Sequence, residues 1–377
     1  MKHFLFFMMV FLMLHVSAQE PENSSRATNN IELNEVELEN KQPNKIFQEV
    51  VSPKPTAKKA KSRSMDAYKS SQFSQSKQVL ETETKRARYQ SNSRSPSIQS
   101  QQRMDDEVQL LKEVDDQSFD YHLYHYISGN YDVSRQSSLY EAAELDESNT
   151  SVHKLLVANS VVKGDVNEAK KYLNKLVSSG SLSQETIAYA EDVLKSSADN
   201  QILLTHGTND SYGCFYNQYV VSNQFSSIVV ISLDLMKSQS YRELLLKKGI
   251  KLPAREFIDV QYFKDFCDLN ANRGISISMT FPIDYLRPIA NRLIPYGLVF
   301  RTGKQVPLCA SDLDDLWKNE FNKKNLNEFD SPESRNYSKN YVPAQTILKD
   351  YHQANQGNMY MNSTKDQKVT KKKIDKH

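Results

Sequence analysis

A group of polar residues follows a short apolar run near the middle of the chain, in the stretch ILLTHGTNDSYGCFYNQYV. Its members that could take part in chemistry are His206, Gly207, Asn209, Asp210 and Ser211. The stretch lacks the phosphate-loop pattern GxxxxGK[ST], the dinucleotide pattern GxGxxG and the GxSxG nucleophile elbow. Three roles remain open: these residues cap the next helix, they bind a ligand, or they carry out acid–base chemistry.

Each role makes a different demand on the stretch. For capping, Asp210 or Asn209 is a suitable N-cap of a helix starting near Ser211, worth about 1 kcal/mol, and Gly207 supplies a tight turn. For acid–base chemistry, His206 would need to pair with Asp210 or Asp234. For ligand binding, polar residues after neighbouring strands should join the group, and the candidates are Asp234, Thr280 and Arg301.

The elements that must position these residues are strands alternating with helices. Apolar runs at 201–206, 226–235, 274–281 and 296–302 are separated by segments whose apolar residues recur at helical spacing. This alternation predicts a small, mostly parallel α/β sheet in a domain over residues 199–355, with further helices at its C-terminal end. Open α/β sheets bind ligands beyond the carboxyl ends of their strands, where His206, Asp210 and Asp234 are expected.

Two features of the C-terminal half concern helix ends and packing. Pro288 is expected either to open a helix or to kink it. In SDLDDLWKNEF, Ser311 is the expected N-cap, and Leu313, Leu316, Trp317 and Phe321 form the inward face. Trp317 is therefore interpreted as an anchor of this helix on the sheet and not as a sugar-binding residue.

A helical region precedes the α/β domain, over residues 105–198. Gly129 and Gly164 are 35 residues apart, and each closes one amphipathic helix just before another begins. This spacing is close to the 34-residue tetratricopeptide period, and the block resembles such repeats. An array of about two repeats must bury its open end, and the α/β domain is the expected cover.

Residues 200–352 also resemble a known family. The stretch ILLTHGTNDSYGCFYNQYV with SSIVVISLDLMKSQSYRELLL, and later FPIDYLRPIANRLIPYGLVFRTG, LDDLWKNEF and SRNYSKNYVPAQTILKDY, are similar to the soluble C-terminal region of protein O-mannosyltransferase-like bacterial membrane proteins. The resemblance places Gly207, Asn209, Asp210 and Ser211 in the family's Gly-Asp-Asn-Asp-Thr-type loop, with Thr208 in place of an acid. The family's membrane-spanning part has no counterpart here, so the resemblance does not imply mannosyl transfer.

The N-terminal residues predict export. MKHFLFFMMVFLMLHVSAQE has a Lys, an apolar run and small residues before Gln19, as in a signal peptide over residues 1–18. Residues 19–104 are poor in large apolar residues and are predicted to be a disordered linker. Residues 19–49 hold 7 Glu against 3 Lys or Arg (net −4), and residues 50–104 hold 12 Lys or Arg against 3 acids (net +9). A Lys-rich disordered tail is predicted over 356–377.

Cysteine and histidine spacing gives no metal site. Cys214, Cys267 and Cys309 lie far apart in sequence, and buried free thiols are favoured over one disulfide for the first two. His122 and His125 lie three residues apart, and packing on a helix is favoured over metal binding because no third ligand is near. No metal and no cofactor are predicted.

The sequence therefore predicts an exported, periplasmic or extracellular protein that does not span the membrane. Its expected function is that of a non-catalytic scaffold or adaptor of the bacterial cell envelope, with a protein or peptide partner on the helical repeat. Two roles are open for the basic arm, residues 50–104: a solvated linker with no specific partner, or a segment that binds an anionic envelope polymer or a lipid surface; a nucleic acid is not expected. The alternative is a glycan-binding module or an enzyme that uses the crevice at residues 206–210.

Overall fold

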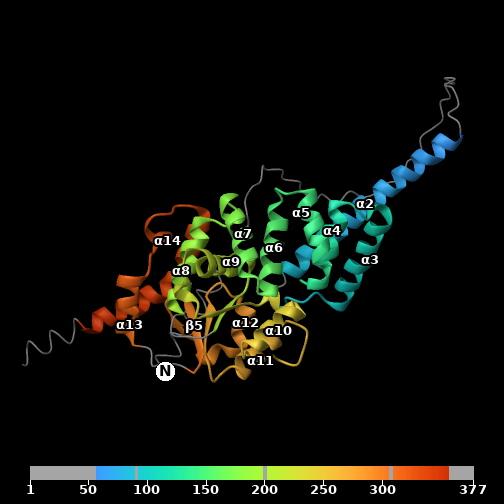
Figure 1. The fold of residues 1–377 in the computed structure, drawn as a ribbon. Coiled ribbons are helices and arrows are strands. Elements are labelled where there is room, and N and C mark those ends of the chain that lie inside the picture. The colour runs from blue at the N-terminus through green and yellow to red at the C-terminus, as the bar shows by residue number, and fades with distance from the viewer. Residues whose placement is uncertain (1–56, 90–91, 198–201, 305–308, 356–377) are drawn as a thin grey trace, which may run out of the picture.

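Helices form most of the described chain, and one small sheet lies among them (Figure 1). The computed structural model describes residues 57–89, 92–197, 202–304 and 309–355. The predicted signal peptide, residues 19–56 of the predicted linker and the Lys-rich tail from residue 356 lie outside the described residues. No helix of the described segments is long and apolar enough to cross a membrane.

The N-terminal part is an array of helices in which consecutive helices up to residue 178 pack against each other, whereas the last helix packs mainly against elements that follow it in the chain. Serine, asparagine or aspartate side chains cap most of these helices by accepting backbone N–H groups of the first turn. Gly164 ends one helix with φ of +74°, a left-handed conformation that glycine adopts without strain. The helices are α2 (Ala57–Tyr89), α3 (Ile98–Asp115), α4 (Phe119–Ser128), α5 (Gln136–Leu145), α6 (Thr150–Lys163), α7 (Val166–Ser178) and α8 (Gln184–Ser196).

The helical part begins earlier than the sequence predicts. Helices α2 and α3 both start before residue 105, inside the segment for which the composition predicts disorder. The side of α2 that faces α3 buries Leu80 but also the polar Ser76 and Glu83. Glu83 is held there by ion pairs with Arg86 at 3.0 Å and with Arg103 at 3.1 Å. Because two of the three buried side chains described for α2 are polar, hydrophobic composition alone did not reveal this helix pair.

The sheet is mixed, and the prediction of a mostly parallel sheet is wrong. Its order is β2-β1-β3-β5-β4: β1 is parallel to β2 and β3, whereas β5 is antiparallel to β3 and to β4. A two-residue turn at Gly297 and Leu298 joins β4 directly to β5, and such a short link permits only antiparallel pairing. The strands are β1 (Ile202–Thr205), β2 (Val229–Ser232), β3 (Gly274–Ser278), β4 (Ile294–Tyr296) and β5 (Val299–Gly303).

Helices surround the sheet, as expected for an α/β part. Pro288 lies at the second position of η5, so it opens a tight helical turn directly after α12. Cys309, and not the predicted Ser311, precedes the first helix of the C-terminal group. The elements are α9 (Thr208–Tyr216), η2 (Asn217–Val221), η3 (Asn223–Phe225), η4 (Asp234–Lys237), α10 (Gln239–Lys247), α11 (Val260–Leu269), α12 (Ile283–Leu286), η5 (Arg287–Arg292), α13 (Ala310–Asp315), η6 (Leu316–Glu320), α14 (Lys324–Asn327), α15 (Pro332–Ser338) and η7 (Lys339–Tyr341).

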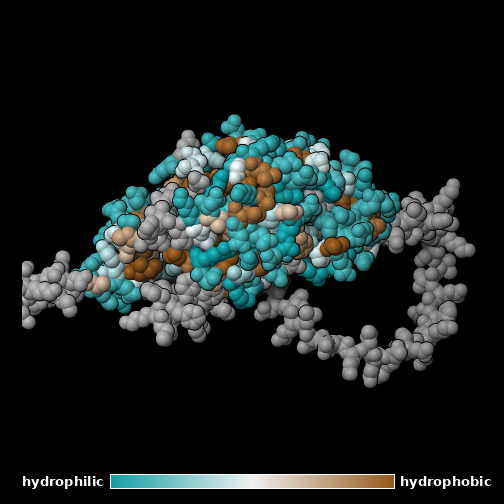
Figure 2. All heavy atoms as spheres, turned by 90° about the horizontal axis from the view of Figure 1, so that it is seen from below, coloured by the Kyte–Doolittle hydropathy of each residue, from teal (hydrophilic) through white to brown (hydrophobic). Residues whose placement is uncertain are grey.

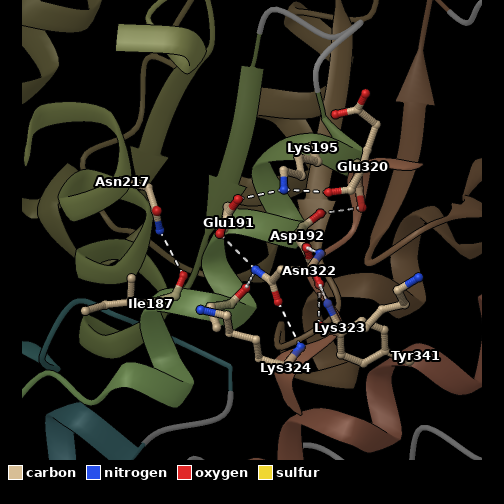
Figure 3. Close-up of polar contacts among 12 residues, drawn as sticks. Ile187, Glu191, Asp192, Lys195, Asn217, Glu320, Asn322, Lys323, Lys324 and Tyr341 are labelled. Carbon is tan, nitrogen blue, oxygen red and sulfur yellow. Dashed lines mark hydrogen bonds and ion pairs between the residues drawn. The ribbon is translucent and has the colours of Figure 1, made fainter. Parts of the chain in front are cut away.

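Asp192 on α8 fastens the C-terminal helices to the helical array (Figure 3). Its carboxylate accepts the backbone N–H groups of Asn322 at 2.8 Å and Lys323 at 3.1 Å, and the Tyr341 hydroxyl at 2.8 Å. Burial raises the pKa of Asp192, and the three donors offset this only in part. Trp317 is half-buried against Phe321 and Tyr341, which agrees with its predicted packing role.

One hydrophobic core runs through both parts of the molecule. It includes Leu156 of α6 and Leu173 of α7 together with Leu203 of β1 and Ile277 of β3. A smaller core joins α2, α3 and α4 around Leu80. On the face that Figure 2 shows, hydrophilic residues predominate and hydrophobic ones form separate small patches. The sheet and the helical array therefore share one interior.

Candidate functional site

The carboxyl ends of β1, β2 and β3 meet at one edge of the sheet, because these three strands are parallel. His206 and Gly207 follow β1, Asp234 follows β2, and Thr280 follows β3. The structure thus brings these predicted residues to the same edge. Asn209 lies half-buried in the first turn of α9, next to this edge.

Asp210 links β1 to β3 at this edge. One carboxylate oxygen accepts the backbone N–H of His206 at 3.0 Å, and the other accepts the Ser278 hydroxyl at 2.9 Å. The predicted role of Asp210 or Asn209 as N-cap is wrong, because α9 begins at Thr208 and its N-cap is Gly207. Gly207 is extended, with φ of −99°, so it does not make the predicted tight turn either.

Ser211 and His206 are both buried. The Ser211 hydroxyl lies 2.8 Å from the Thr205 hydroxyl and donates to the Gly207 carbonyl at 2.8 Å, so it braces the strand-to-helix junction. The His206 ring stands edge-on to Phe281 and Tyr285, and its Nε2 atom has no hydrogen-bond partner among the described residues.

His206 is not arranged as the predicted acid–base pair. Burial lowers its pKa well below the ordinary value; nearby Arg94 lowers it further, and Asp234 opposes this. The ring is therefore neutral at physiological pH. Asp210 meets His206 through the backbone N–H of this residue, which positions the chain.

Asp234 joins the sheet to the helical array. One carboxylate oxygen pairs with Lys237 Nζ at 2.8 Å, and the other accepts the Tyr131 hydroxyl from the turn after α4. Burial alone would raise the pKa of Asp234, but Lys237, Tyr131 and Arg94 together lower it to about 2. Asp234 is therefore a carboxylate with both oxygens engaged.

Arg301 does not belong to this edge, and its prediction as a site residue there is wrong. Because β5 is antiparallel to β3, its last residues lie at the opposite end of the sheet from the ends of β1 and β3. The buried Arg301 guanidinium donates to the Ser196 carbonyl at 2.9 Å and stacks on the Tyr296 ring at 3.7 Å. It secures the end of α8.

A cavity of about 320 Å³ lies between the helical array and the ends of β1 and β2. Gly207, Thr208 and Asp234 line it from the sheet side, Tyr131 lines it from the turn after α4, and Lys154 lines it from α6. Pockets of this kind bind small molecules, and about 300 Å³ is near their lower size limit. The cavity lies at the carboxyl edge, where α/β proteins bind their ligands.

The charged residues that line the cavity come mainly from the helical array. Helix α2 and the chain before α3 contribute three of the six charged residues, and the segment that follows β2 contributes two. Four cations face two carboxylates, which leaves a formal charge of +2. These residues are Lys85, Arg94, Lys154, Lys237, Glu81 and Asp234.

The turn that follows α4 is strained where it meets the cavity. Asn130 has φ of +51° and Tyr131 has φ of +64°, and a tyrosine in this region costs about 1 kcal/mol. The Asn130 amide donates to Gln101 at 2.8 Å, and Ser238 donates to the Tyr131 carbonyl at 3.0 Å. Neighbouring elements thus hold the turn so that Tyr131 reaches Asp234. Strained backbone of this kind is concentrated at functional sites.

The sequence reasoning missed the helical half of this site. Arg94 falls in the segment for which disorder is predicted, and Lys154 looks like an ordinary surface lysine of a helix. Tyr131 and Asp234 are 103 residues apart. The Gly129-Asn130 pair was the one local signal of an unusual turn beside the site.

The remaining predicted residues take structural positions. His125 Nδ1 lies 2.8 Å from the Ser138 hydroxyl, and His122 is buried in the same helix. Cys214 and Cys267 are buried free thiols, whereas Cys309 is exposed. Among the described residues, no group of His, Cys, Asp and Glu side chains is arranged to hold a metal ion.

No protein family, curated protein or solved structure matches the chain. The resemblance of residues 200–352 to the mannosyltransferase-like family, and that of residues 105–198 to tetratricopeptide repeats, therefore stay predictions. The function has to be inferred from the geometry of the cavity and its surroundings.

Proposed function

We propose that the protein is a binding module whose small ligand occupies the cavity between the helical array and the carboxyl edge of the sheet. The observation that carries the proposal is that α2, α4, α6 and the segments that follow β1 and β2 meet around one space of about 320 Å³. Apolar Leu123 and Leu155 and polar Tyr131 and Lys154 share its lining, and ligand sites typically combine an apolar wall with a few placed polar groups.

The position of the cavity supports the proposal further. The sequence predicts possible ligand binding at the loop after β1, and Gly207 and Thr208 of this loop line the cavity. Asp210 turns to the other side, toward Ser278 of β3. The role of residues 206–210 is thus to shape one wall of the site, with Asp210 as a brace.

A second candidate is the exported scaffold or adaptor that the sequence predicts. It is supported by the array of successively packed helices from α2 to α7, an arrangement that repeat proteins use to present a surface to a protein or peptide. Residues 1–18 support the proposal of export to the periplasm or beyond the cell. The net positive charge of residues 50–104 supports the proposal that this segment binds an anionic surface. Both roles are compatible in one molecule.

The ligand-binding proposal is tested by blocking the cavity. Ser151 is an exposed residue at the start of α6 that lines the cavity, so Ser151→Trp fills it with an indole ring. Ser178→Trp, at the exposed end of α7, is the matched control. Thermal unfolding of all three proteins is measured against a library of sugars, organic acids, phosphorylated metabolites and short peptides.

A ligand of the cavity raises the melting temperature of the wild type and of Ser178→Trp but not of Ser151→Trp, because only the folded, open cavity binds it. Equal stabilisation of Ser151→Trp would place the binding site elsewhere. If only peptides raise the melting temperature, and raise it equally in all three proteins, the scaffold candidate is favoured.

A further inference from the structure

We propose that the end of β1 is an acid-sensitive latch: His206 takes up a proton when the wall of the cavity opens there, so this opening becomes more frequent in mildly acidic solution. The latch is a property of the folded chain and needs no ligand, so it goes beyond the proposed function. It depends on three features: the burial of the His206 ring, the charged groups around it, and its position between two walls of the cavity.

The first feature is the packing of the His206 ring. The residue is only 4% exposed, and the ring stands edge-on to Phe281 and Tyr285, with ring centroids 5.3 Å and 5.6 Å away. A protonated imidazole donates from both ring nitrogens, but the Nε2 atom has no hydrogen-bond partner among the described residues. The closed structure therefore suits the neutral ring, and a charged ring would lack the hydrogen bonds that water gives it.

The second feature is the positive charge next to the ring. Burial lowers the pKa of His206, and the Arg94 guanidinium, from the chain before α3, lowers it further. Arg94 also acts on Tyr285, whose pKa is raised to about 12 by burial against the opposing effect of this guanidinium. Arg94 thus has its own contacts within the fold and stays charged at every pH at which a histidine titrates. A proton on the buried ring would stand beside a fixed cation.

Two carboxylates also act near His206. Asp234 of η4 favours a proton on the ring, but Lys237 and the Tyr131 hydroxyl engage its two oxygens. One oxygen of Asp210, on α9, accepts the backbone N–H of His206, and the other faces β3. Both carboxylates therefore take part in contacts that hold the fold, and the effect of burial and of the neighbouring cation prevails at the ring.

The third feature is the position of His206 between two walls of the cavity. It directly precedes Gly207 and Thr208, which line the cavity from the sheet side, whereas Arg94 lines it from the chain before α3. The Arg94 backbone N–H donates to the Ile258 carbonyl at 2.7 Å, so the second wall is attached to the chain before α11 and not to β1. Separation of the two walls exposes the ring to water, where it can be charged, and widens the cavity.

Acid favours the open form because the ring binds a proton readily only there. In the open form His206 has its ordinary pKa of 6.5, and in the closed form its pKa is well below this value. The closed form is fully favoured above pH 6.5, and this advantage is lost as the pH falls toward the lower pKa. Between pH 7.5 and pH 5.5 the equilibrium constant for opening therefore rises about tenfold.

The test is hydrogen exchange of the full chain at pH 7.5 and pH 5.5, with each rate divided by the intrinsic rate of that amide at the same pH. In the wild type, we expect the opening constants of residues 92–98 and 206–212 to be about tenfold higher at pH 5.5. His206→Leu cannot titrate and should remove this difference, and His206→Gln takes its place if the leucine variant does not fold. At pH 5.5 the two segments should also exchange faster than α8, because the opening is local.

His153→Gln on α6 is the matched control, because burial also lowers the pKa of His153, whose ring stacks on Tyr172 within the helical array. This variant should keep the tenfold change at residues 206–212. The inference fails if the wild type and His206→Leu respond equally to pH, or if residues 206–212 exchange no faster than α8 at pH 5.5, since acid would then act only by unfolding the whole molecule. Ligand binding is tested separately, by the Ser151→Trp comparison.

Discussion

At the scale of single residues, Asp210 connects β1 to β3 through two hydrogen bonds. Replacing it with Ala and with Asn should therefore lower the free energy of unfolding by different amounts. Asp210→Ala loses both the His206 N–H and the Ser278 hydroxyl, which costs about 1–2 kcal/mol in the free energy of unfolding. Asp210→Asn costs less, because the remaining oxygen still accepts one N–H and the amide can donate to Ser278. Urea unfolding of both variants measures the difference.

The Ser278→Ala variant is the control for this pair. If Asp210 and Ser278 act through their mutual contact, the double variant with Asp210→Ala is less destabilised than the sum of the two single variants. Equal stability of Asp210→Asn and the wild type, together with a ligand that only the wild type binds, would show instead that the negative charge is needed for binding.

Asp234 predicts a pH dependence of stability. Its pKa is about 2 in the folded protein and 3.8 in the unfolded chain, so the unfolded state binds protons first as the pH falls. The stabilisation, about 2 kcal/mol, is complete above the unfolded pKa and is lost as the pH falls from about 4 toward 2. Asp234→Asn therefore lowers the free energy of unfolding by about 2 kcal/mol near neutral pH and by little near pH 2.

The measurement is urea unfolding of the wild type and Asp234→Asn at several pH values. Glu144→Gln, at an exposed position of α5, is the control for removal of one negative charge. A difference between the wild type and Asp234→Asn that stays constant with pH would contradict the role of Lys237 and Tyr131 in holding the charged form.

Half of the candidate site could be read from the sequence. The residues that follow β1 and β2 could be predicted, because polar residues directly after an apolar run form a pattern that is visible in the local sequence. Arg94, Tyr131 and Lys154 could not be found in this way, because they reach the cavity through contacts with elements far along the chain. Arg301 was misplaced because the direction of β5 depends on its neighbour and not on its own sequence.

At the scale of elements, α2 depends on a small core and is predicted to be the least stable part of the described fold. Leu80 is 1% exposed and packs with residues of α3 and α4 in a core separate from the main one. Leu80→Ala removes about 2–5 kcal/mol of local packing. Hydrogen exchange should therefore increase in α2 and in the facing side of α3, and stay unchanged in α8 and β1.

Val79→Ala is the matched control, because Val79 is the neighbouring apolar residue and is only half-buried. It should change exchange in α2 much less. Faster exchange in β1 after Leu80→Ala would mean that α2 and the main core unfold together. The same variant reports on the cavity, since Glu81 and Lys85 of α2 line it: loosening α2 should weaken any ligand bound there.

The helices could be predicted from the sequence more reliably than the direction of the strands. Helix periodicity and capping residues are local, so the helices near Gly164 and Ser183 could be placed from the sequence. The pairing direction of a strand depends on the length of its connection. The turn at Gly297 was not identified, because residues 296–302 were interpreted as one apolar run and not as the end of β4, a turn and β5.

At the scale of the whole molecule, many polar contacts join the helical array to the rest, and three of them show how they are distributed. Asp192 of α8 binds the C-terminal segment, the Tyr131 hydroxyl binds Asp234, and the Tyr212 hydroxyl donates to the Lys154 carbonyl at 2.7 Å. The main hydrophobic core also crosses the boundary. The proposed cavity lies on this boundary, so its shape depends on both parts being folded at the same time.

The shared core predicts that both parts unfold in one cooperative transition. Leu156 of α6 is fully buried in it, and Leu156→Ala costs about 2–5 kcal/mol. Trp317, the one tryptophan of the sequence, lies in the C-terminal group of helices, so its fluorescence reports on a distant region. In urea, the midpoints measured by far-ultraviolet circular dichroism and by Trp317 fluorescence should fall by the same amount in Leu156→Ala. Leu145→Ala, at a position that is 53% exposed, should move neither midpoint, and a fall of the dichroism midpoint alone would show that the helical array unfolds by itself and that the cavity opens without loss of the sheet.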